Sequence, residues 1–184
     1  MPGKFNFTFA GNIGKVQNLE NVLRGFQIFS KNYSNAYLNI IGDGSFLKYL
    51  KTFVVTENIK NVNFAGRKSL SEMSDYYKAS DVLIISLKDV PLYEIMIPSK
   101  FQVYLVTHKP IFAIFKGEVR KIVENYSLGL AANPSDIDDI AKGFKMFSKF
   151  SKDEIKKISE NSEYLSKSIF NREKLIEKIN QFIW

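Results

Sequence analysis

The sequence predicts an α/β domain in which about six parallel strands form a doubly wound sheet with helices on both faces. Short apolar stretches alternate with segments of helical periodicity along the chain. One of them, DVLIIS at 81–86, is almost continuously apolar, as are strands buried on both faces of a parallel sheet. Glycines follow several predicted strands, where the chain must turn into a helix.

The first half of the chain contains three predicted strands and three predicted helices. The strands are predicted over 4–10, 36–41 and 61–66. The helices are predicted over 18–32, 46–57 and 69–79. The first helix has apolar residues at helical spacing, namely Leu19, Val22, Leu23, Phe26 and Phe29. The stretch SLSE at 69–72 has the pattern of a capping box at the start of the third.

The second half continues the alternation and then becomes helical. Strands are predicted over 81–86, 110–115 and 128–132. A loop separates the first of these from a helix in which Pro98 suits the first turn, and a further helix covers 118–125. Residues 135–184 are predicted to be helical with lysine-rich outer faces. We expect one domain overall, with a core unit over 1–150 and C-terminal helices over 151–184 packed on it.

Composition excludes several classes of site. The 184 residues include no cysteine, so neither a disulfide nor a thiolate metal site can form. The single histidine, His108, argues against a histidine-rich metal site. No apolar run is long enough for a membrane span, and the N-terminal MPGKFNF lacks a signal-peptide core. We therefore expect a cytoplasmic protein, with peripheral association at the inner face of the membrane as an alternative.

The formal net charge of +7 favours anionic partners, although lysines also serve solubility. The lysines are spread over many predicted helices rather than gathered on one. Binding to nucleic acid needs a clustered basic surface with interleaved aromatic residues, so we expect no nucleic-acid partner.

Two glycines, Gly11 and Gly14, separate the first strand from its helix in FTFAGNIGKVQNLENVLRGF. A tight turn explains one of them. Two suggest exposed backbone N–H groups at a helix start, which is a favourable place for a phosphate. Ligands of doubly wound sheets bind at the carboxyl ends of the strands, so this edge is the predicted site. The hypothesis requires Gly11, Gly66 and Lys100 to lie on the same side of the molecule.

Five segments in order give a family resemblance over roughly 5–147. They are FAGNIGKVQNLENVLRGF, NIIGDGSFLKYL, NVNFAGRKSLSEMSDYYKASDVLIISL, IPSKFQVYLVTHKPIFA and KGEVRKIVENYSLGLAANPSDIDDIA. Together they resemble the C-terminal, donor-binding half of the retaining GT-B glycosyltransferases that build bacterial surface polysaccharides. The resemblance implies a Rossmann-like domain that forms one half of a GT-B fold.

The resemblance also implies a function. The donor is a nucleotide-diphosphate sugar, with a UDP-sugar as the commonest kind, and no metal or other cofactor is needed. The enzyme is expected to be a retaining transferase of hexosyl type that acts on a glycan or lipid-linked acceptor. The acceptor is held by an N-terminal domain, so we expect this chain to be an isolated domain, a fragment or a subunit that needs a partner. The C-terminal Phe182, Ile183 and Trp184 would then lack their usual cover.

Matching the family's motifs residue by residue gives a candidate donor site. The donor-binding residues are predicted to be Gly11, Asn12, Gly14, Arg67, Lys68, Ser99, Lys100, Gln102, Gly117 and Glu118. The catalytic candidates are Glu94 and Lys100. Lys100 also stands out on physical grounds, because it brings a positive charge to a helix N-terminus, where the macrodipole disfavours it and a bound anion would remove the conflict.

Two departures from the family pattern leave an alternative open. The family has an arginine and a lysine after the first strand, whereas this loop offers only Lys15. The family's ribose-binding glutamate corresponds to Val103, unless a one-residue slip gives that role to Gln102, eight residues after Glu94. The alternative function is a catalytically silent sugar-nucleotide-binding module that supports a partner subunit. A sugar-nucleotide epimerase is disfavoured, because its glutamates and histidines have no clear counterpart.

Overall fold

The computed structural model describes residues 4–171 and contains one six-stranded sheet in which every neighbouring pair is parallel. The strands are β1 (Phe5–Ala10), β2 (Ala36–Ile41), β3 (Val62–Gly66), β4 (Val82–Ser86), β5 (Ile111–Ile114) and β6 (Gly129–Ala132). Their order is β3-β2-β1-β4-β5-β6. The predicted doubly wound sheet is therefore confirmed. Strands β1 to β3 extend the sheet in one direction, and β4 to β6 extend it in the other, so the topological switch point lies between β1 and β4.

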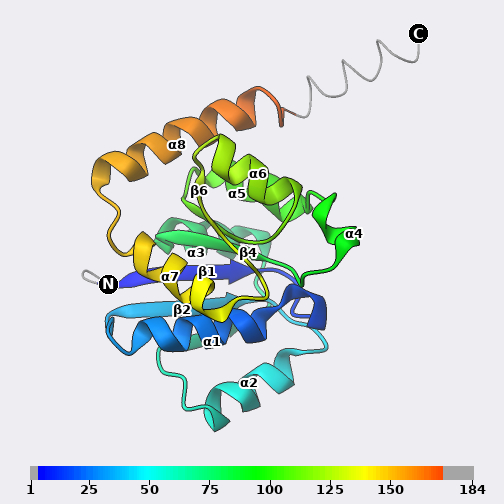
Figure 1. The fold of residues 1–184 in the computed structure, drawn as a ribbon, viewed down its shortest axis with the longest axis vertical. Coiled ribbons are helices and arrows are strands. Elements are labelled where there is room, and N and C mark those ends of the chain that lie inside the picture. The colour runs from blue at the N-terminus through cyan, green and yellow to red at the C-terminus, as the bar shows by residue number, and fades with distance from the viewer. Residues whose placement is uncertain (1–3, 172–184) are drawn as a thin grey trace.

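Helices cover both faces of the sheet (Figure 1). They are α1 (Leu19–Ser30), α2 (Leu47–Thr56), α3 (Leu70–Ala79), α4 (Pro91–Glu94), α5 (Ser99–Thr107), α6 (Glu118–Asn125), α7 (Ile137–Phe147) and α8 (Lys152–Lys167). Apolar residues of α1, α2 and α7 form a core on one face, and those of α5, α6 and α8 form a second core on the other.

Three local predictions need correction. The short helix α4 and a 3₁₀ turn, η1 (Lys15–Gln17), lie where the sequence predicted only loop. Pro98 is the residue before α5 rather than part of its first turn. The helical region from 135 onward is broken between α7 and α8. The expectation for Phe182, Ile183 and Trp184 lies outside the described residues.

Aromatic rings fill the first core. The ring of Phe7 on β1 lies 4.7 Å from that of Phe144 on α7, edge to face, and both side chains are fully buried. Helices α1 and α7 pack closely there, because a Cβ on Gly25 would lie 2.5 Å from Ile140. The fit ties α7 to the sheet, and α8 joins the second core through the fully buried Leu165.

The capping box at the start of α3 is present as predicted. The Ser69 hydroxyl accepts a hydrogen bond from the Glu72 N–H at 3.3 Å, and the Glu72 carboxylate accepts one from the Ser69 N–H at 2.9 Å. We expect Ser69→Ala to lower the free energy of unfolding by about 1 kcal/mol, because it leaves helix N–H groups without a partner. Urea unfolding measures this loss. The exposed Ser74, inside the same helix, provides the control, and equal stability of Ser69→Ala and Ser74→Ala would contradict the prediction.

Candidate functional site

A groove lies at the carboxyl ends of the central strands, on the side where α3 and α5 begin. It consists of two adjoining hollows of about 420 and 520 Å³ that share Ala10, Gly11, Asn12 and Tyr77. The first hollow extends to Arg67 and Lys68 after β3, and we call it the Arg67 arm. The second extends to Lys100 on α5 and Ser86 on β4, and we call it the Lys100 arm. In doubly wound sheets ligands bind at this switch point.

Gly11 lies where the two arms meet, and its φ of +145° is a backbone conformation that residues with side chains rarely adopt. A Cβ on Gly11 would lie 2.8 Å from both the Cε and the Nζ of Lys100. A Cβ on Gly42, in the neighbouring loop, would lie 1.8 Å from the carbonyl oxygen of Gly11. The Gly42 N–H in turn donates to the Gly66 carbonyl at 2.9 Å. Gly11, Gly66 and Lys100 therefore lie at one edge of the sheet.

The hypothesis that Gly11 and Gly14 present free N–H groups is wrong. The Gly11 N–H donates to the Ile41 carbonyl at 2.9 Å, and the Gly14 N–H donates to the Gln17 side chain at 2.8 Å. Within residues 4–171, the N–H of the exposed Asn12 has no such partner and remains available to a ligand. The glycines allow two loops to pack together, and they leave Asn12 as the free donor.

Lys100 is the strongest electrostatic feature of the groove. Its Nζ lies 3.6 Å from the centre of the Phe9 ring, beneath the end of β1. Among the described residues it has neither an ion pair nor a hydrogen bond. Burial lowers the pKa of Lys100 to about 7, because the surrounding protein disfavours the charged amine. An anion bound in the Lys100 arm would supply the missing partner.

Tyr104 holds α5, the helix that carries Lys100, against the end of β1. This role was not predicted from the sequence. Tyr104 lies one turn further along α5 than Lys100, on the same face, and is fully buried. Its hydroxyl accepts a hydrogen bond from the Ala10 N–H at 3.1 Å and approaches the Ala10 carbonyl at 3.4 Å. Burial raises the pKa of Tyr104, so the hydroxyl stays protonated. The spacing of four residues indicates that Tyr104 and Lys100 share one face of a helix. The hydrogen-bond partner of Tyr104, Ala10, lies 94 positions away in the sequence, so the contact itself could not be predicted.

The two cations after β3 differ in availability. Arg67 is exposed and has no ion pair among the described residues. Lys68 lies 3.5 Å from the Glu72 carboxylate and 5.5 Å from the centre of the Tyr76 ring. The hydroxyl of Tyr76, and after it the charge of Glu72, raise the pKa of Lys68. Arg67 is therefore the freer of the two to meet a ligand in the Arg67 arm.

Five of the predicted site residues lie outside the groove lining, namely Gly14, Glu94, Gln102, Gly117 and Glu118. Gln102 is exposed, and its neighbour Val103 lines the Lys100 arm instead, so the proposed one-residue slip is not supported by the geometry. Gly117 packs against the backbone of Glu94, where a Cβ would lie 2.0 Å from the Glu94 carbonyl. The carboxylate of Glu118 is paired with Lys121 at 2.8 Å. Ser99, in contrast, lines the Lys100 arm at the start of α5.

An ion pair holds together the loops on the far side of the Lys100 arm. Lys116, after β5, lies 2.6 Å from the carboxylate of Asp89, after β4. The same carboxylate accepts a hydrogen bond from Ser135, after β6, at 3.0 Å. The bond from Lys116 is the main reason why the pKa of Asp89 is lowered. These contacts position the segment that carries Tyr93 and Met96 along the Lys100 arm.

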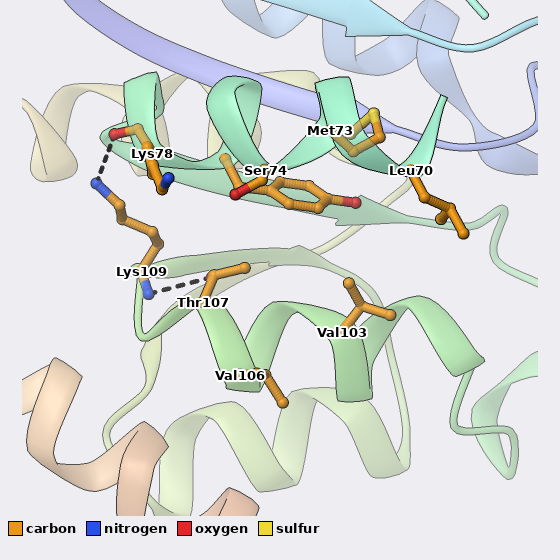
Figure 2. A pocket seen from close by; sticks show the side chains of 9 residues that line it. Leu70, Met73, Ser74, Lys78, Val103, Val106, Thr107 and Lys109 are labelled. Atoms are coloured by element: carbon orange, nitrogen blue, oxygen red, sulfur yellow. Dashed lines mark hydrogen bonds between the residues drawn. The ribbon is translucent and has the colours of Figure 1, made fainter. Parts of the chain in front are cut away.

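A third, largely apolar hollow of about 660 Å³ continues from the groove between α3 and α5 (Figure 2). Leu70 and Met73 of α3 line it opposite Val103 and Val106 of α5. At its far end the Nζ of Lys109 donates to the backbone carbonyl of Lys78 at 3.0 Å. This hollow offers further apolar surface next to the groove, whose Arg67 arm carries the basic side chains of Arg67 and Lys68.

Residues 4–171 contain neither a metal-binding cluster nor a membrane-spanning helix. No group of three or more histidine, cysteine, aspartate or glutamate side chains is arranged to hold a metal ion. No helix in this part of the chain has the length and apolar character needed to cross a bilayer.

Comparison with known sequences gives a family. The model for "Glycosyl transferases group 1" matches residues 2–167. The chain is 29% identical over 136 residues to the probable glycosyltransferase WbjE of Pseudomonas aeruginosa, which covers 73% of this chain and 33% of that protein. It is 25% identical over 138 residues to the uncharacterized glycosyltransferase MJ1178 of Methanocaldococcus jannaschii, which covers 74% and 37% respectively. The match thus spans about a third of each relative.

Solved structures agree in fold. HepE of Anabaena, solved in complex with UDP and glucose, superposes with a TM-score of 0.81 at 13% identity, over 98% of this chain and 48% of that one. The C-terminal domain of the group 1 protein LpcC of Francisella tularensis superposes with a TM-score of 0.71 at 17% identity, over 92% and 88%. The chain belongs to the glycosyl transferases group 1 family and has the fold of the C-terminal, Rossmann-like half of a GT-B glycosyltransferase.

Proposed function

We propose that this chain is the donor half of a glycosyltransferase and that it binds a nucleotide-diphosphate sugar, with UDP as the nucleotide, in the groove at the switch point. The proposal includes transfer with retention, of hexosyl type, to a glycan or lipid-linked acceptor in surface polysaccharide synthesis. An acceptor domain would face the groove. The reaction would take place in the cytoplasm, at or near the membrane.

One observation carries the proposal. The amine of Lys100 has no ion pair among the described residues, yet it lies against Gly11 at the point where the two arms of the groove meet. A cation left without a partner in a partly closed groove is a ready site for an anion. HepE, which shares this fold, has been solved with UDP and with UDP-glucose.

The groove suits the charge changes of glycosyl transfer. When the bond between the sugar and the diphosphate breaks, negative charge grows on the diphosphate. Positively charged groups already placed beside it lower the barrier, because they need no reorganisation during the reaction. In this proposal the Lys100 amine and the Asn12 N–H hold the diphosphate, and Arg67 stacks on the base or meets a phosphate. These groups supply the charge that a metal ion supplies in other transferases, so the proposal includes no metal.

Amide NMR tests this function directly. Titrating ¹⁵N-labelled protein with UDP-glucose should shift the signals of Gly11, Asn12 and Arg67 more than those of residues at the opposite edge of the sheet. A single-stranded oligonucleotide should leave them in place. If no nucleotide in a panel of UDP, GDP, CDP and dTDP shifts these signals, the donor-binding function is refuted.

Val103 favours a second candidate, a binding module without catalytic activity. A valine cannot form hydrogen bonds with ribose hydroxyls, and the acidic candidate Glu94 lies outside the groove lining. A module of this kind would bind the nucleotide and contribute no catalytic group. Transfer by this chain together with an acceptor half would exclude it, and donor binding without transfer would favour it.

The valine also yields a testable prediction. We expect Val103→Glu to raise the affinity for UDP about tenfold, because a carboxylate there can accept hydrogen bonds from the ribose, worth about 1.5 kcal/mol. Isothermal titration with UDP and with 2′-deoxy-UDP measures the effect, which should be smaller for the deoxy ligand. Val106→Glu, one turn along α5 and outside both arms, is the control. Equal affinities of the two variants would place the ribose elsewhere.

A further inference from the structure

Ser86, at the end of β4, has a buried hydroxyl with no hydrogen-bond partner. The residue is 2% exposed. Among the described residues only Ser162, on α8, shares this property. Leaving a buried hydroxyl unpaired costs about 1–3 kcal/mol, so such a group calls for an explanation.

The two unpaired serines differ in location. Ser162 lies on α8 and is absent from the lining of either arm. Ser86 lines the Lys100 arm, together with Ser99 and Lys100. A ligand in this arm can therefore pair with Ser86, once its buried hydroxyl turns toward the arm, and not with Ser162.

The order of groups along the groove indicates which part of a ligand would reach Ser86. Gly11 belongs to both arms, Arg67 only to one and Ser86 only to the other. Ser86 also pairs with Ile114 of β5, on the side of β4 away from β1. A linear ligand with its base beside Arg67 and its diphosphate beside Gly11 and Lys100 thus has its far end at Ser86.

We infer that Ser86 contacts the sugar of the donor and helps to select it. The inference rests on the proposed function, which sets the base in the Arg67 arm. A serine hydroxyl donates and accepts, and so does a sugar hydroxyl, whereas a phosphate oxygen only accepts. Rotation about a single staggered bond turns the serine hydroxyl toward a ligand. The same arm is lined by apolar side chains such as Val16 and Met96 and by the polar side chains of Asn12, Gln17 and Tyr93, so Ser86 would be one of several polar contacts to a sugar there.

The test compares Ser86→Ala with Ser162→Ala, which removes the other unpaired hydroxyl. Affinities of the full chain are measured by titration calorimetry for UDP, UDP-glucose and UDP-N-acetylglucosamine. We expect Ser86→Ala to weaken at least one UDP-sugar about three- to tenfold, as loss of one hydrogen bond does, and to leave the affinity for UDP unchanged. Ser162→Ala should change none of the three. Saturation transfer to the sugar protons should fall only in Ser86→Ala.

Three results would count against the inference or its basis. Unchanged sugar affinities in Ser86→Ala would overturn it. An equal loss for UDP and for the UDP-sugars would also overturn it, because the contact would then be to the nucleotide. Failure of the unmodified chain to bind UDP at all would refute the proposed function itself. Should Ser86→Ala unfold in the thermal scan, Ser86→Cys keeps the volume, removes the strong donor and is expected to give the same pattern.

Discussion

Replacing Lys100 by methionine is expected to weaken the binding of UDP about tenfold or more, corresponding to about 1–2 kcal/mol. The amine lies in the Lys100 arm without an ion pair among the described residues, and a diphosphate would be its counter-charge. Methionine is one atom shorter than lysine and keeps most of the apolar stem, and its thioether can pack on the Phe9 ring in place of the amine. The loss of affinity would therefore report the charge rather than a change in packing.

The same substitution should stabilise the ligand-free protein near pH 6. Burial lowers the pKa of Lys100 to about 7, from an ordinary value of 10.5 in the unfolded chain. Below pH 7 the folded protein carries the charge at a partly buried site, where it is less well solvated than in the unfolded chain. Between pH 7 and about 10.5 the folded state releases a proton that the unfolded state keeps, so the stability of the unmodified protein rises with pH. The advantage of Lys100→Met should thus shrink as the pH rises from 6 to 9.

Binding has the opposite dependence on pH. The ligand requires the protonated amine, so the affinity for UDP should fall as the pH rises above 7, and binding there should be accompanied by proton uptake. Calorimetry at pH 7 and pH 9, in buffers with different ionisation enthalpies, measures both effects. Lys48→Met, which removes an exposed lysine of α2, controls for net charge. An unchanged dissociation constant in Lys100→Met would remove Lys100 from the site.

The sheet was predictable because its signals are local. The strand DVLIIS at 81–86 is apolar throughout, and the observed strand, Val82–Ser86, differs by one residue. The four-residue helix α4 is too short to produce a periodic pattern, and it was missed. Contacts between distant segments were also out of reach, as Tyr104 on Ala10 and the unpaired Ser86 show.

The candidate site was predictable only in part. Lys100 was singled out by its charge at a helix start, and the structure adds its burial and its contact with Gly11. Gln102 was chosen by sequence spacing alone, whereas rotation about the axis of α5 turns Val103 to the groove instead. A shift of one position moves a side chain by about 100° around a helix, so an alignment error of one residue exchanges a residue that lines the groove for one that does not.

Gly42→Ala is expected to lower the free energy of unfolding by about 3 kcal/mol or more and to abolish nucleotide binding. Gly42 has a φ of +137°, and its Cβ would lie 1.8 Å from the carbonyl oxygen of Gly11. The obstacle is backbone, which cannot swing aside as a flexible side chain does. The loop that carries Gly11 would have to move, and the groove would open.

Gly66→Ala separates steric overlap from backbone strain. Gly66 lies at the same sheet edge with a φ of +71°, but nothing lies within 4 Å of its Cβ position. Only the left-handed conformation should be penalised, at about 1–2 kcal/mol. Urea unfolding and UDP titration of both variants measure the difference. A Gly42→Ala variant as stable as Gly66→Ala would mean that the two loops are not packed together, and the explanation of Gly42 as a packing glycine would fail.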